Sequence, residues 1–406
     1  MRSVSEHQRI VAALFDAPDP VLRPPAQALG SATIEAVTAP ITLPGFDNSA
    51  MDGYAVRAAD IVGATPNHPV RLPVAEDIPA GRTDELTLAP GTAHRIMTGA
   101  AVPDGADAVV PVEYTDAATT TVTITGAVDV GKHIRRAGSD ITAGAEALPA
   151  GLVLGAPQIG LLAALGIADV VVGRRLRAVV LSTGSELVAA GTPLRHGQIY
   201  ESNGAMLTAA VTLAGADAEH LHFVPDDTGD FLARLDSVAD DADLIITSGG
   251  VSAGAFEVVK DALTGGGTVD FVKVAMQPGM PQGAGTVTAP NGRRVPIITL
   301  PGNPVSALVS FEVFIRPALR TAMGLPPDRR RITARLGAPI RSPQGKRQFL
   351  RGVLRADPAG PVVEPIGPPA SHHLRFLAAA DALIDIPVDV TELPADAAVE
   401  VMVLDD

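Results

Sequence analysis

The middle of the chain alternates between two hydrophobic patterns. Short apolar runs typical of buried strands are followed by longer segments in which apolar residues recur every three or four positions, as in amphipathic helices. We predict strands at residues 178–182, 218–224, 244–247, 269–274 and 295–300, and helices at residues 203–214, 228–239, 255–263 and 304–323. Ser202 or Asn203 is expected to cap the first of these helices, and Gly215 to close it. Strands that alternate with helices predict a parallel, doubly wound sheet.

The sequence on either side of this region follows other patterns. A capping box at residues 3–6 and apolar residues at helical spacing predict an amphipathic helix over residues 4–16. Residues 38–137 contain short β-like runs between Pro and Gly clusters, which predicts a β-rich module, and residues 157–168 return to a helical pattern. Short strands resume over residues 331–406, where we expect a small β-barrel or sandwich. The chain is therefore predicted to be a multidomain α/β protein.

Composition narrows the classes of partner. Among 406 residues, Lys and Arg number 31 and Asp and Glu number 45, which gives a net charge of −14. This acidity argues against nucleic acid or an anionic membrane as the main partner. The absence of Cys excludes disulfides, thiolate metal sites and a Cys nucleophile. The first ten residues contain no apolar core of a signal peptide, so we expect a cytoplasmic protein.

A glycine-rich loop follows the predicted strand at residues 244–247. Ser248, Gly249, Gly250 and Ser252 belong to a loop that is nearly all backbone and that runs into a predicted helix. Backbone N–H groups in such a loop, at a helix N-terminus, favour an anion. Two other interpretations stay open at this point. The loop could be a βα turn without a ligand, or the G-x-S-x-G pattern over residues 250–254 could be a nucleophile elbow.

Further polar residues fall where the predicted strands end. Three polar loops occur there, at residues 182–187, 248–254 and 300–306. Ligands of parallel α/β sheets bind at this edge. Glu186, Asp226, Asp227 and Glu257 each follow a predicted strand, and several carboxylates at one edge suit a hard cation such as Mg²⁺, whereas a single one would be a helix cap. Lys273 lies in an otherwise apolar strand, where a Lys usually needs a partner, so a functional role is favoured.

The β-rich module carries its own polar stretches, at residues 46–56, 95–100 and 132–140. Lys132, His133, Arg135 and Arg136 form a basic cluster that is either a solvated edge or a grip on a phosphate or oxyanion. Asp52 is either an Asx-turn residue or a functional carboxylate.

Two other motifs are disfavoured. Residues 126–133 come within one residue of a P-loop, but His133 stands where Ser or Thr would hold Mg²⁺, and the surroundings are β-rich. His372 and His373 could be a metal pair, but they are adjacent in a predicted β region, where neighbouring side chains point to opposite faces, which disfavours one shared metal ion.

Taken together, these motifs resemble the MoeA family of molybdopterin molybdenumtransferases, which also includes the C-terminal domain of gephyrin. The resemblance covers essentially the whole chain and is specific because many motifs occur in order. It rests on FDNSAMDGYAVR (46–57), RIMTGA (95–100), GADAVVPVE (105–113), IRRAGSD (134–140), STGSEL (182–187), GQIYESN (197–203), TSGGVS (247–252), KVAMQPG (273–279) and LPGNPVSAL (300–308).

The resemblance implies an activity and a set of site residues. Members insert molybdenum from molybdate into adenylylated molybdopterin and release AMP, with Mg²⁺ or another divalent cation. They are elongated homodimers whose cleft lies between the αβ domain of one subunit and the β-rich module of the other. The implied catalytic residues are Asp52, Glu186, Glu257 and Lys273. The implied substrate contacts are Thr98, Arg135, Arg136, Asp140, Ser248, Gly249, Gly250, Ser252, Pro301, Asn303 and Pro304. The implied metal ligands are Glu186, Asp226, Asp227 and Glu257.

The resemblance also implies a division into four parts. We expect a discontinuous linking and dimerisation domain at residues 1–37 and 138–176, the β-rich module at 38–137, a MogA-like αβ domain at 177–325 that binds molybdopterin, and a C-terminal β-barrel at 326–406.

The chain also departs from the family's pattern. Ala255 stands where many members have a carboxylate, Glu257 replaces an Asp, and Ser185 replaces another Asp. Gln277 and Met280 replace basic residues. These departures keep a second function open, a gephyrin-like scaffold of the same fold that binds a protein partner at its C-terminal region. A serine hydrolase is the third alternative, and it would need a His partner after Ser252.

Overall fold

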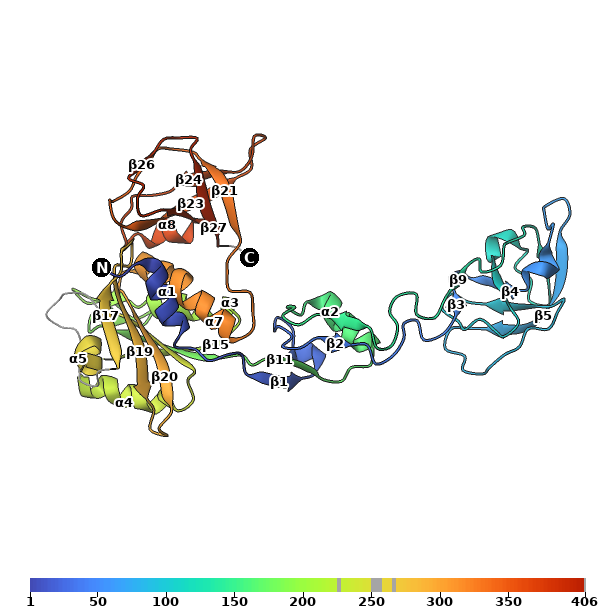
Figure 1. The fold of residues 1–406 in the computed structure, drawn as a ribbon, viewed down its shortest axis with the longest axis horizontal. Coiled ribbons are helices and arrows are strands. Elements are labelled where there is room, and N and C mark those ends of the chain that lie inside the picture. The colour runs from blue at the N-terminus through green and yellow to red at the C-terminus, as the bar shows by residue number, and fades with distance from the viewer. Residues whose placement is uncertain (225–227, 250–257, 265–267, 405–406) are drawn as a thin grey trace.

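The chain folds into an elongated molecule with three regions along its length (Figure 1). The computed structural model describes residues 1–224, 228–249, 258–264 and 268–404. Both chain ends lie in the bulky region that holds the central sheet and the C-terminal strands. A small middle region follows, and the β-rich module forms the far end.

The central sheet contains six strands in the order β15-β12-β16-β20-β19-β17. Their bounds are Asp217–Val224 for β15, Arg177–Thr183 for β12, Leu244–Ser248 for β16, Arg294–Leu300 for β20, Pro281–Thr288 for β19 and Val269–Lys273 for β17. The first four are parallel, as predicted, whereas β19 runs antiparallel to both of its neighbours. The sequence patterns predicted every strand of this sheet except β19.

Helices cover both faces of the sheet, which confirms the doubly wound prediction. One face packs against α1 (Val4–Ala12), α3 (Asn203–Leu213), α6 (Pro304–Ser310) and α7 (Arg316–Ala322), and the other against α4 (Thr228–Ala239) and α5 (Val258–Thr264). The single helix predicted over residues 304–323 is interrupted by a π-helical turn at Phe311–Ile315. Helix α1 is shorter than predicted, although its Glu6 N–H donates to the Ser3 hydroxyl as the capping box requires.

The residue that closes α3 was predicted correctly, whereas the side chain that caps its start was not. Gly215 follows the helix with a φ of +98°, a left-handed conformation that suits Gly. Ser202 occupies the N-cap position, but its side chain makes no capping hydrogen bond. The carboxylate of Glu201 takes that role instead, because its Oε1 accepts from the Gly204 N–H at 2.6 Å.

The middle region consists of two short ribbons and one helix. Strand β1 (Pro20–Arg23) pairs with β11 (Val170–Gly173), β2 (Val37–Thr38) pairs with β10 (Glu146–Leu148), and the region also contains the 3₁₀ turn η1 (Pro25–Gln27) and α2 (Ala156–Ala164). The β2–β10 ribbon leads to the β-rich module. Beyond it, a bridge between Leu43 and Ile141 keeps the incoming and outgoing segments side by side.

The β-rich module contains no α-helix in residues 38–137, all of which the structure describes. Its main sheet has the order β7-β4-β6-β5-β8. The bounds are Ala108–Pro111 for β7, Gly53–Val56 for β4, Ala93–Ile96 for β6, Val70–Ile78 for β5 and Thr121–Ile124 for β8, with 3₁₀ turns η2 (Ala58–Ile61) and η3 (Val112–Tyr114). A second small sheet pairs β3 (Asn48–Ser49) with β9 (Ile134–Arg135). Residues 126–133 connect β8 to β9 with no helix after them, which confirms that they are not a P-loop.

The C-terminal strands close into a barrel, so the sandwich alternative is wrong. Strands β23, β24, β21, β27 and β25 pair in this order, and β25 also pairs with β23. Their bounds are Arg347–Arg355, Val362–Pro365, Arg331–Leu336, Ala398–Val403 and Ala382–Ile386, respectively. The pair β22 (Ile340–Arg341) and β26 (Glu392–Leu393) and the helix α8 (Leu374–Ala378) complete this part. Strand β18 (Met276–Gln277) pairs with β23 and so ties the barrel to the αβ region. No described helix is long and apolar enough to cross a membrane.

Candidate active site

The carboxyl ends of three parallel strands meet at one edge of the central sheet. Ser182 of β12 is in register with Ser248 of β16, which in turn is in register with Leu300 of β20. The three strands after which polar loops were predicted therefore end at the same edge of the sheet. Gly249 continues the edge with a φ of +101°, and a Cβ there would lie 2.8 Å from the Thr183 carbonyl oxygen, so only Gly fits.

Asn203 links two of these loops. Its Nδ2 donates to the Ser248 hydroxyl oxygen at 2.7 Å and to the Gly302 carbonyl oxygen at 2.6 Å. Glu201, two residues earlier, has a side chain that is only 3% exposed, and it accepts from the Ser182 hydroxyl at 2.9 Å. Sequence reasoning considered Asn203 only as a helix cap and missed Glu201. The motif GQIYESN contained both residues, but their partners follow strands that lie far away in the sequence.

A cleft of about 720 Å³ separates this edge from the barrel. The αβ side contributes Glu186, Ile199, residues 276–281, Pro301, Gly302, Asn303 and Ser306, and the barrel side contributes Lys346, Pro369, Ala370, Ser371 and His372. The cleft thus brings together Glu186, Pro301 and Asn303 of the predicted site, and Pro304 follows directly as the first residue of α6. Lys346 and His372 were not predicted as site residues. Gln277 and Met280, which replace basic residues of the family, also line this cleft.

The segment between β12 and α3 contributes Glu186 and Ile199 to the wall of the cleft. It carries the short parallel ribbon of β13 (Leu187–Val188) and β14 (Ile199–Tyr200). Glu186 is exposed just before this ribbon, and its carboxylate folds back over Gly184. A Cβ at Gly184 would lie 2.6 Å from Glu186 Oε2, so the glycine makes room for the carboxylate.

The predicted metal ligands are described only in part. Glu186 is described, whereas Asp226, Asp227 and Glu257, together with Gly250 and Ser252, lie outside the described residues. Among the residues that the structure does describe, no group of three or more His, Cys, Asp or Glu side chains could hold a metal ion.

Lys273 occupies the last position of the edge strand β17 and is exposed. Because Lys273 is exposed, burial does not require a partner for it, and its functional role stays a prediction. Its register partner Pro281 lines the cleft, but Lys273 itself does not.

A second group of predicted residues lies in the β-rich module. Asp52 Oδ1 accepts from the Thr98 N–H at 2.7 Å and from the Thr98 hydroxyl at 2.8 Å. These hydrogen bonds, first the backbone one, lower the pKa of Asp52 below its usual value, so this exposed carboxylate stays ionised. The Asx-turn interpretation is wrong, because Asp52 bonds to a residue 46 positions along the chain.

The two arginines of the basic cluster in this module have different partners. Arg136 forms an ion pair with Asp47, whose other oxygen accepts from the Ala137 N–H at 2.8 Å. The Ala137 bond, and then Arg136, lower the pKa of Asp47. Arg135 lies opposite Asn48 in the β3–β9 ribbon, is exposed, and makes no ion pair with any described residue. Asp140 is also exposed, in the segment that returns to the middle region.

The two groups of predicted residues belong to regions at opposite ends of the elongated molecule (Figure 1). The group around Asp52, Thr98 and Arg135 belongs to the β-rich module, and the group around Glu186, Ser248 and Asn303 belongs to the central sheet. One copy of the chain does not bring them together.

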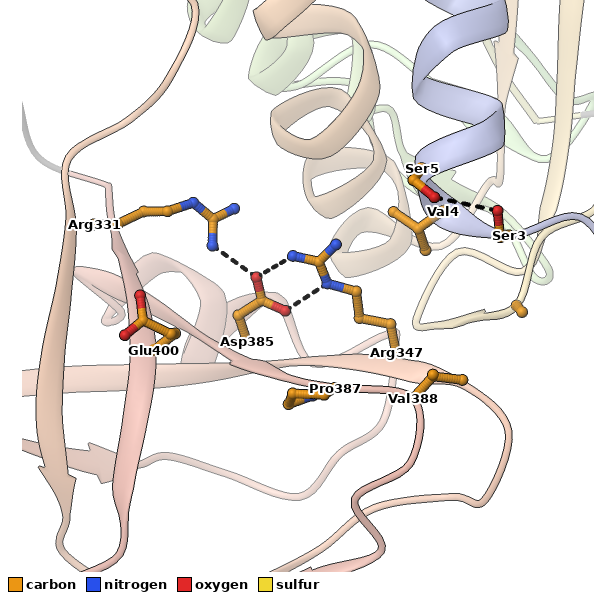
Figure 2. Close-up of a pocket in the computed structure, with 10 residues that line it drawn as sticks. Ser3, Val4, Ser5, Arg331, Arg347, Asp385, Pro387, Val388 and Glu400 are labelled. Atoms are coloured by element: carbon orange, nitrogen blue, oxygen red, sulfur yellow. Dashed lines mark hydrogen bonds and ion pairs between the residues drawn. The ribbon is translucent and has the colours of Figure 1, made fainter.

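A second cavity, of about 380 Å³, lies between the start of α1 and the barrel (Figure 2). Its charged wall is Asp385, which accepts from Arg331 at 2.7 Å and from Arg347 on both oxygens. Burial opposes ionisation of Asp385, but its two guanidinium partners outweigh it and lower the pKa. None of the predicted site residues lines this cavity.

Comparison with known proteins agrees with this architecture. Three family models match consecutive parts of the chain: MoeA N-terminal region (domain I and II) over residues 2–166, probable molybdopterin binding domain over residues 179–321, and MoeA C-terminal region (domain IV) over residues 333–404. The fold and the site edge thus define an α/β protein that carries a domain of the molybdopterin-binding class between two MoeA regions.

Whole-chain relatives give the same result. Molybdopterin molybdenumtransferase 2 of Mycobacterium tuberculosis is 58% identical and the match covers 99% of each chain. Molybdopterin molybdenumtransferase 1 of the same organism is 37% identical over 100% of this chain and 99% of its own. A crystal structure of the molybdopterin biosynthesis MoeA protein from Pyrococcus horikosii superposes with a TM-score of 0.81 at 30% identity, covering 100% of this chain and 99% of that one. The chain belongs to the MoeA family of molybdopterin molybdenumtransferases.

Proposed function

We propose that the chain is an enzyme of molybdenum cofactor biosynthesis that inserts molybdenum from molybdate into adenylylated molybdopterin and releases AMP. The observation that carries this proposal is the large cleft beside the sheet edge, which Glu186, Pro301 and Asn303 line from the loops after β12 and β20, in a chain that belongs throughout to this family. We place the reaction in the cytoplasm and on small-molecule substrates.

The charge of the cleft is consistent with anionic substrates. The protein as a whole carries a net charge of −14, yet the barrel side of the cleft presents Lys346 and His372. Molybdate and the phosphates of an adenylylated pterin are anions, and a local cation is what holds them in an acidic protein. Ser306 and Asn303 add neutral polar groups on the opposite wall.

The predicted donor set fits a divalent cation such as Mg²⁺. Glu186, Asp226, Asp227 and Glu257 offer carboxylate oxygens, which are the ligands that Mg²⁺ prefers. Glu186 lies exposed at the cleft, and Asp226 and Asp227 follow β15, the strand next to β12, along the chain. The ion would neutralise charge on the phosphate bridge that breaks as AMP leaves.

We also propose that the working unit is a homodimer in which each site combines both groups of residues. In one chain the β-rich group and the sheet-edge group lie at opposite ends (Figure 1). Exposed aromatic side chains accompany each group: Phe46, beside Asp47, is 54% exposed, and Tyr200, beside Glu201, is 43% exposed. A second copy that covers them would complete the site and remove apolar surface from water.

Within such a site, Asp52 and Arg135 have different tasks. Asp52 is held ionised by Thr98 and is suited to accept a hydrogen bond from the substrate. Arg135, which makes no ion pair with the described residues, is suited to bind an oxyanion.

The test is to incubate the purified protein with adenylylated molybdopterin, molybdate and Mg²⁺ and to measure AMP. We expect molybdate-dependent AMP release, and a loss of at least about tenfold in Glu186→Gln, which removes one negative charge at the proposed metal site. Glu219→Gln is the matched control, because Glu219 is exposed and bonds Arg177 at the opposite edge of the sheet. A parent protein that releases no AMP contradicts the proposal.

A scaffold function of the gephyrin type is the second candidate. The observation that favours it is the loss of charge at Gln277 and Met280, both of which line the cleft and weaken its attraction for anions. In that case the parent would release no AMP but would bind a protein partner through its C-terminal region.

A further inference from the structure

The amide group of Asn203 has a fixed orientation. Its Nδ2 lies 2.6 Å from the carbonyl oxygen of Gly302, which can only accept, so the nitrogen and not Oδ1 must face that loop. The second N–H of the same group donates to the Ser248 hydroxyl oxygen at 2.7 Å. Both donors of one side chain are therefore used to join the loop after β16 to the loop after β20.

The acceptor of the same amide is unusual. Asn203 Oδ1 is buried and has no hydrogen-bond partner among the described residues. A buried polar atom without a partner costs roughly 1–3 kcal/mol of stability. A side chain that carries this cost is not selected for stability alone, which points to a role in the site.

The backbone around Asn203 is anchored from below. Glu201 Oε1 accepts from the Gly204 N–H at 2.6 Å and from the Ser182 hydroxyl at 2.9 Å, so the first turn of α3 is tied to the end of β12. Gly204 must lack a side chain, because a Cβ there would lie 1.9 Å from His220 Nε2. The backbone next to Asn203 is thus held against the end of β12. From there the Asn203 side chain reaches Ser248 at the end of β16 and Gly302 in the loop after β20.

We propose that Asn203 is a positioning residue that holds Ser248, at the end of β16, and Gly302, after β20, at the spacing needed to bind the adenylylated pterin. This inference rests on the proposed function, because Ser248, Pro301 and Asn303 are its substrate contacts. Without the two hydrogen bonds, Asn203 no longer holds Ser248 and Gly302 at a fixed spacing. The substrate then cannot make its contacts on both sides at the same time.

The decisive variant is Asn203→Asp, which keeps the shape of the side chain but places a carboxylate oxygen against the Gly302 carbonyl. Repulsion between the two acceptors should open the contact on that side. We expect the KM for adenylylated molybdopterin in the AMP-release assay to rise at least about tenfold while kcat stays within about threefold, the pattern of lost uniform binding. A purely structural defect would lower the active fraction, and therefore kcat, and leave KM unchanged.

Two further variants complete the test. Asn291→Asp adds the same charge in the turn between β19 and β20, at the opposite edge, and should behave as the parent. Asn203→Ala removes both donors without placing an acceptor against Gly302, and it should raise KM as Asn203→Asp does. This variant also tests the inference if Asn203→Asp does not fold.

The outcomes separate the two proposals. A parent that releases AMP, together with an Asn203→Asp variant that keeps the parent's KM, overturns the role of Asn203 alone. An Asn203→Ala variant that keeps the parent's KM would also overturn it. A parent that releases no AMP overturns the proposed function, and the role of Asn203 with it.

Discussion

Two neighbouring arginines in the β-rich module have different environments. Arg136 is bound to Asp47, whereas Arg135 is exposed and makes no ion pair within the described part of the chain. The sequence placed both in one basic cluster. It could not separate them, because the partner Asp47 is 89 positions away and reaches Arg136 only through the β3–β9 ribbon.

We predict that Arg135→Ala weakens binding of adenylylated molybdopterin by about ten- to a hundredfold, the value of one charge-assisted hydrogen bond. Arg136→Ala should weaken it less, because its guanidinium is already engaged by Asp47. Equilibrium titration of both variants, with circular dichroism as a check of folding, tests this prediction. Parent-like affinity in Arg135→Ala would return this side chain to the solvated-edge interpretation.

Another single residue makes stability depend on pH. His7 is fully buried on α1 against Phe314, with ring centroids 4.7 Å apart. Burial, and then the charge of Arg2, lower its pKa from 6.5 to about 4, against a smaller opposing effect of Asp270. The folded state therefore binds this proton less readily than the unfolded state does.

We predict that neutral, buried His7 contributes fully to the free energy of unfolding above pH 6.5, and that this contribution is lost as the pH falls towards about 4. The shift corresponds to roughly 3 kcal/mol at most. Urea unfolding measured at several pH values should show that the free energy of unfolding falls less steeply with decreasing pH in His7→Gln than in the parent. His68→Gln, which changes an exposed histidine, should keep the parent's slope. Identical slopes for the parent and His7→Gln would contradict the prediction.

At the scale of elements, local patterns predicted what is locally determined. Periodicity indicated the parallel strands and the helices because burial of one face leaves a repeat in the sequence. Strand β19 leaves no such repeat in the sequence, because Gly283 and Gly285 stand where one face of the strand would otherwise carry apolar side chains. A Cβ at these positions would lie 2.0 Å from Thr299 Oγ1 and from the Thr268 carbonyl oxygen, respectively. Such close approach of neighbouring strands exists only in the folded sheet.

The π-helical turn was not predicted for a similar reason. Helical periodicity continues through residues 304–323 and gives no sign of the widening at Phe311–Ile315. Glu312 in this turn has a side chain that is 4% exposed, and it accepts from Arg329 at 3.0 and 3.1 Å. Arg329 precedes the barrel, so this ion pair connects the αβ region to the barrel.

We predict that Glu312→Ala lowers the free energy of unfolding by about 3–5 kcal/mol, because it leaves a buried guanidinium without its carboxylate. The control is Glu392→Ala, whose side chain is 68% exposed and lies 3.8 Å from Arg341. Its loss should cost at most about 1 kcal/mol. Chemical denaturation of both variants measures the difference, and similar costs would show that the buried pair has no special weight.

At the scale of the whole molecule, motifs predicted the identity of the site residues but not their distances. The family resemblance supplied both groups of residues, and the structure places them at opposite ends of one chain (Figure 1). No periodicity in a sequence encodes a separation between domains or a second copy. The homodimer, the domain limits and the metal ligands at Asp226, Asp227 and Glu257 stay predictions.

Mixing two inactive variants tests whether the site is shared. Asp52→Asn disables the β-rich group and Glu186→Gln disables the sheet-edge group. If each site combines these groups from different copies, one of the two sites in every mixed dimer carries neither change. We predict that refolding an equal mixture restores about a quarter of the parent's AMP release. Activity no greater than that of the separate variants would place both groups in one chain's own site, or remove one of them from the site.

The two segments that connect the β-rich module to the middle region have a mechanical consequence. The chain enters and leaves through the β2–β10 ribbon and stays paired at Leu43 and Ile141. Hydrogen bonds between two strands resist sliding of one strand along the other, so such a neck is stiff within its plane and compliant across it. The module at its end is therefore a lever with one preferred direction of swing. In the proposed homodimer, a small bend of the neck would move Asp52 and Arg135 far and would open or close the shared cleft, while neither of the domains that form it changes its internal structure.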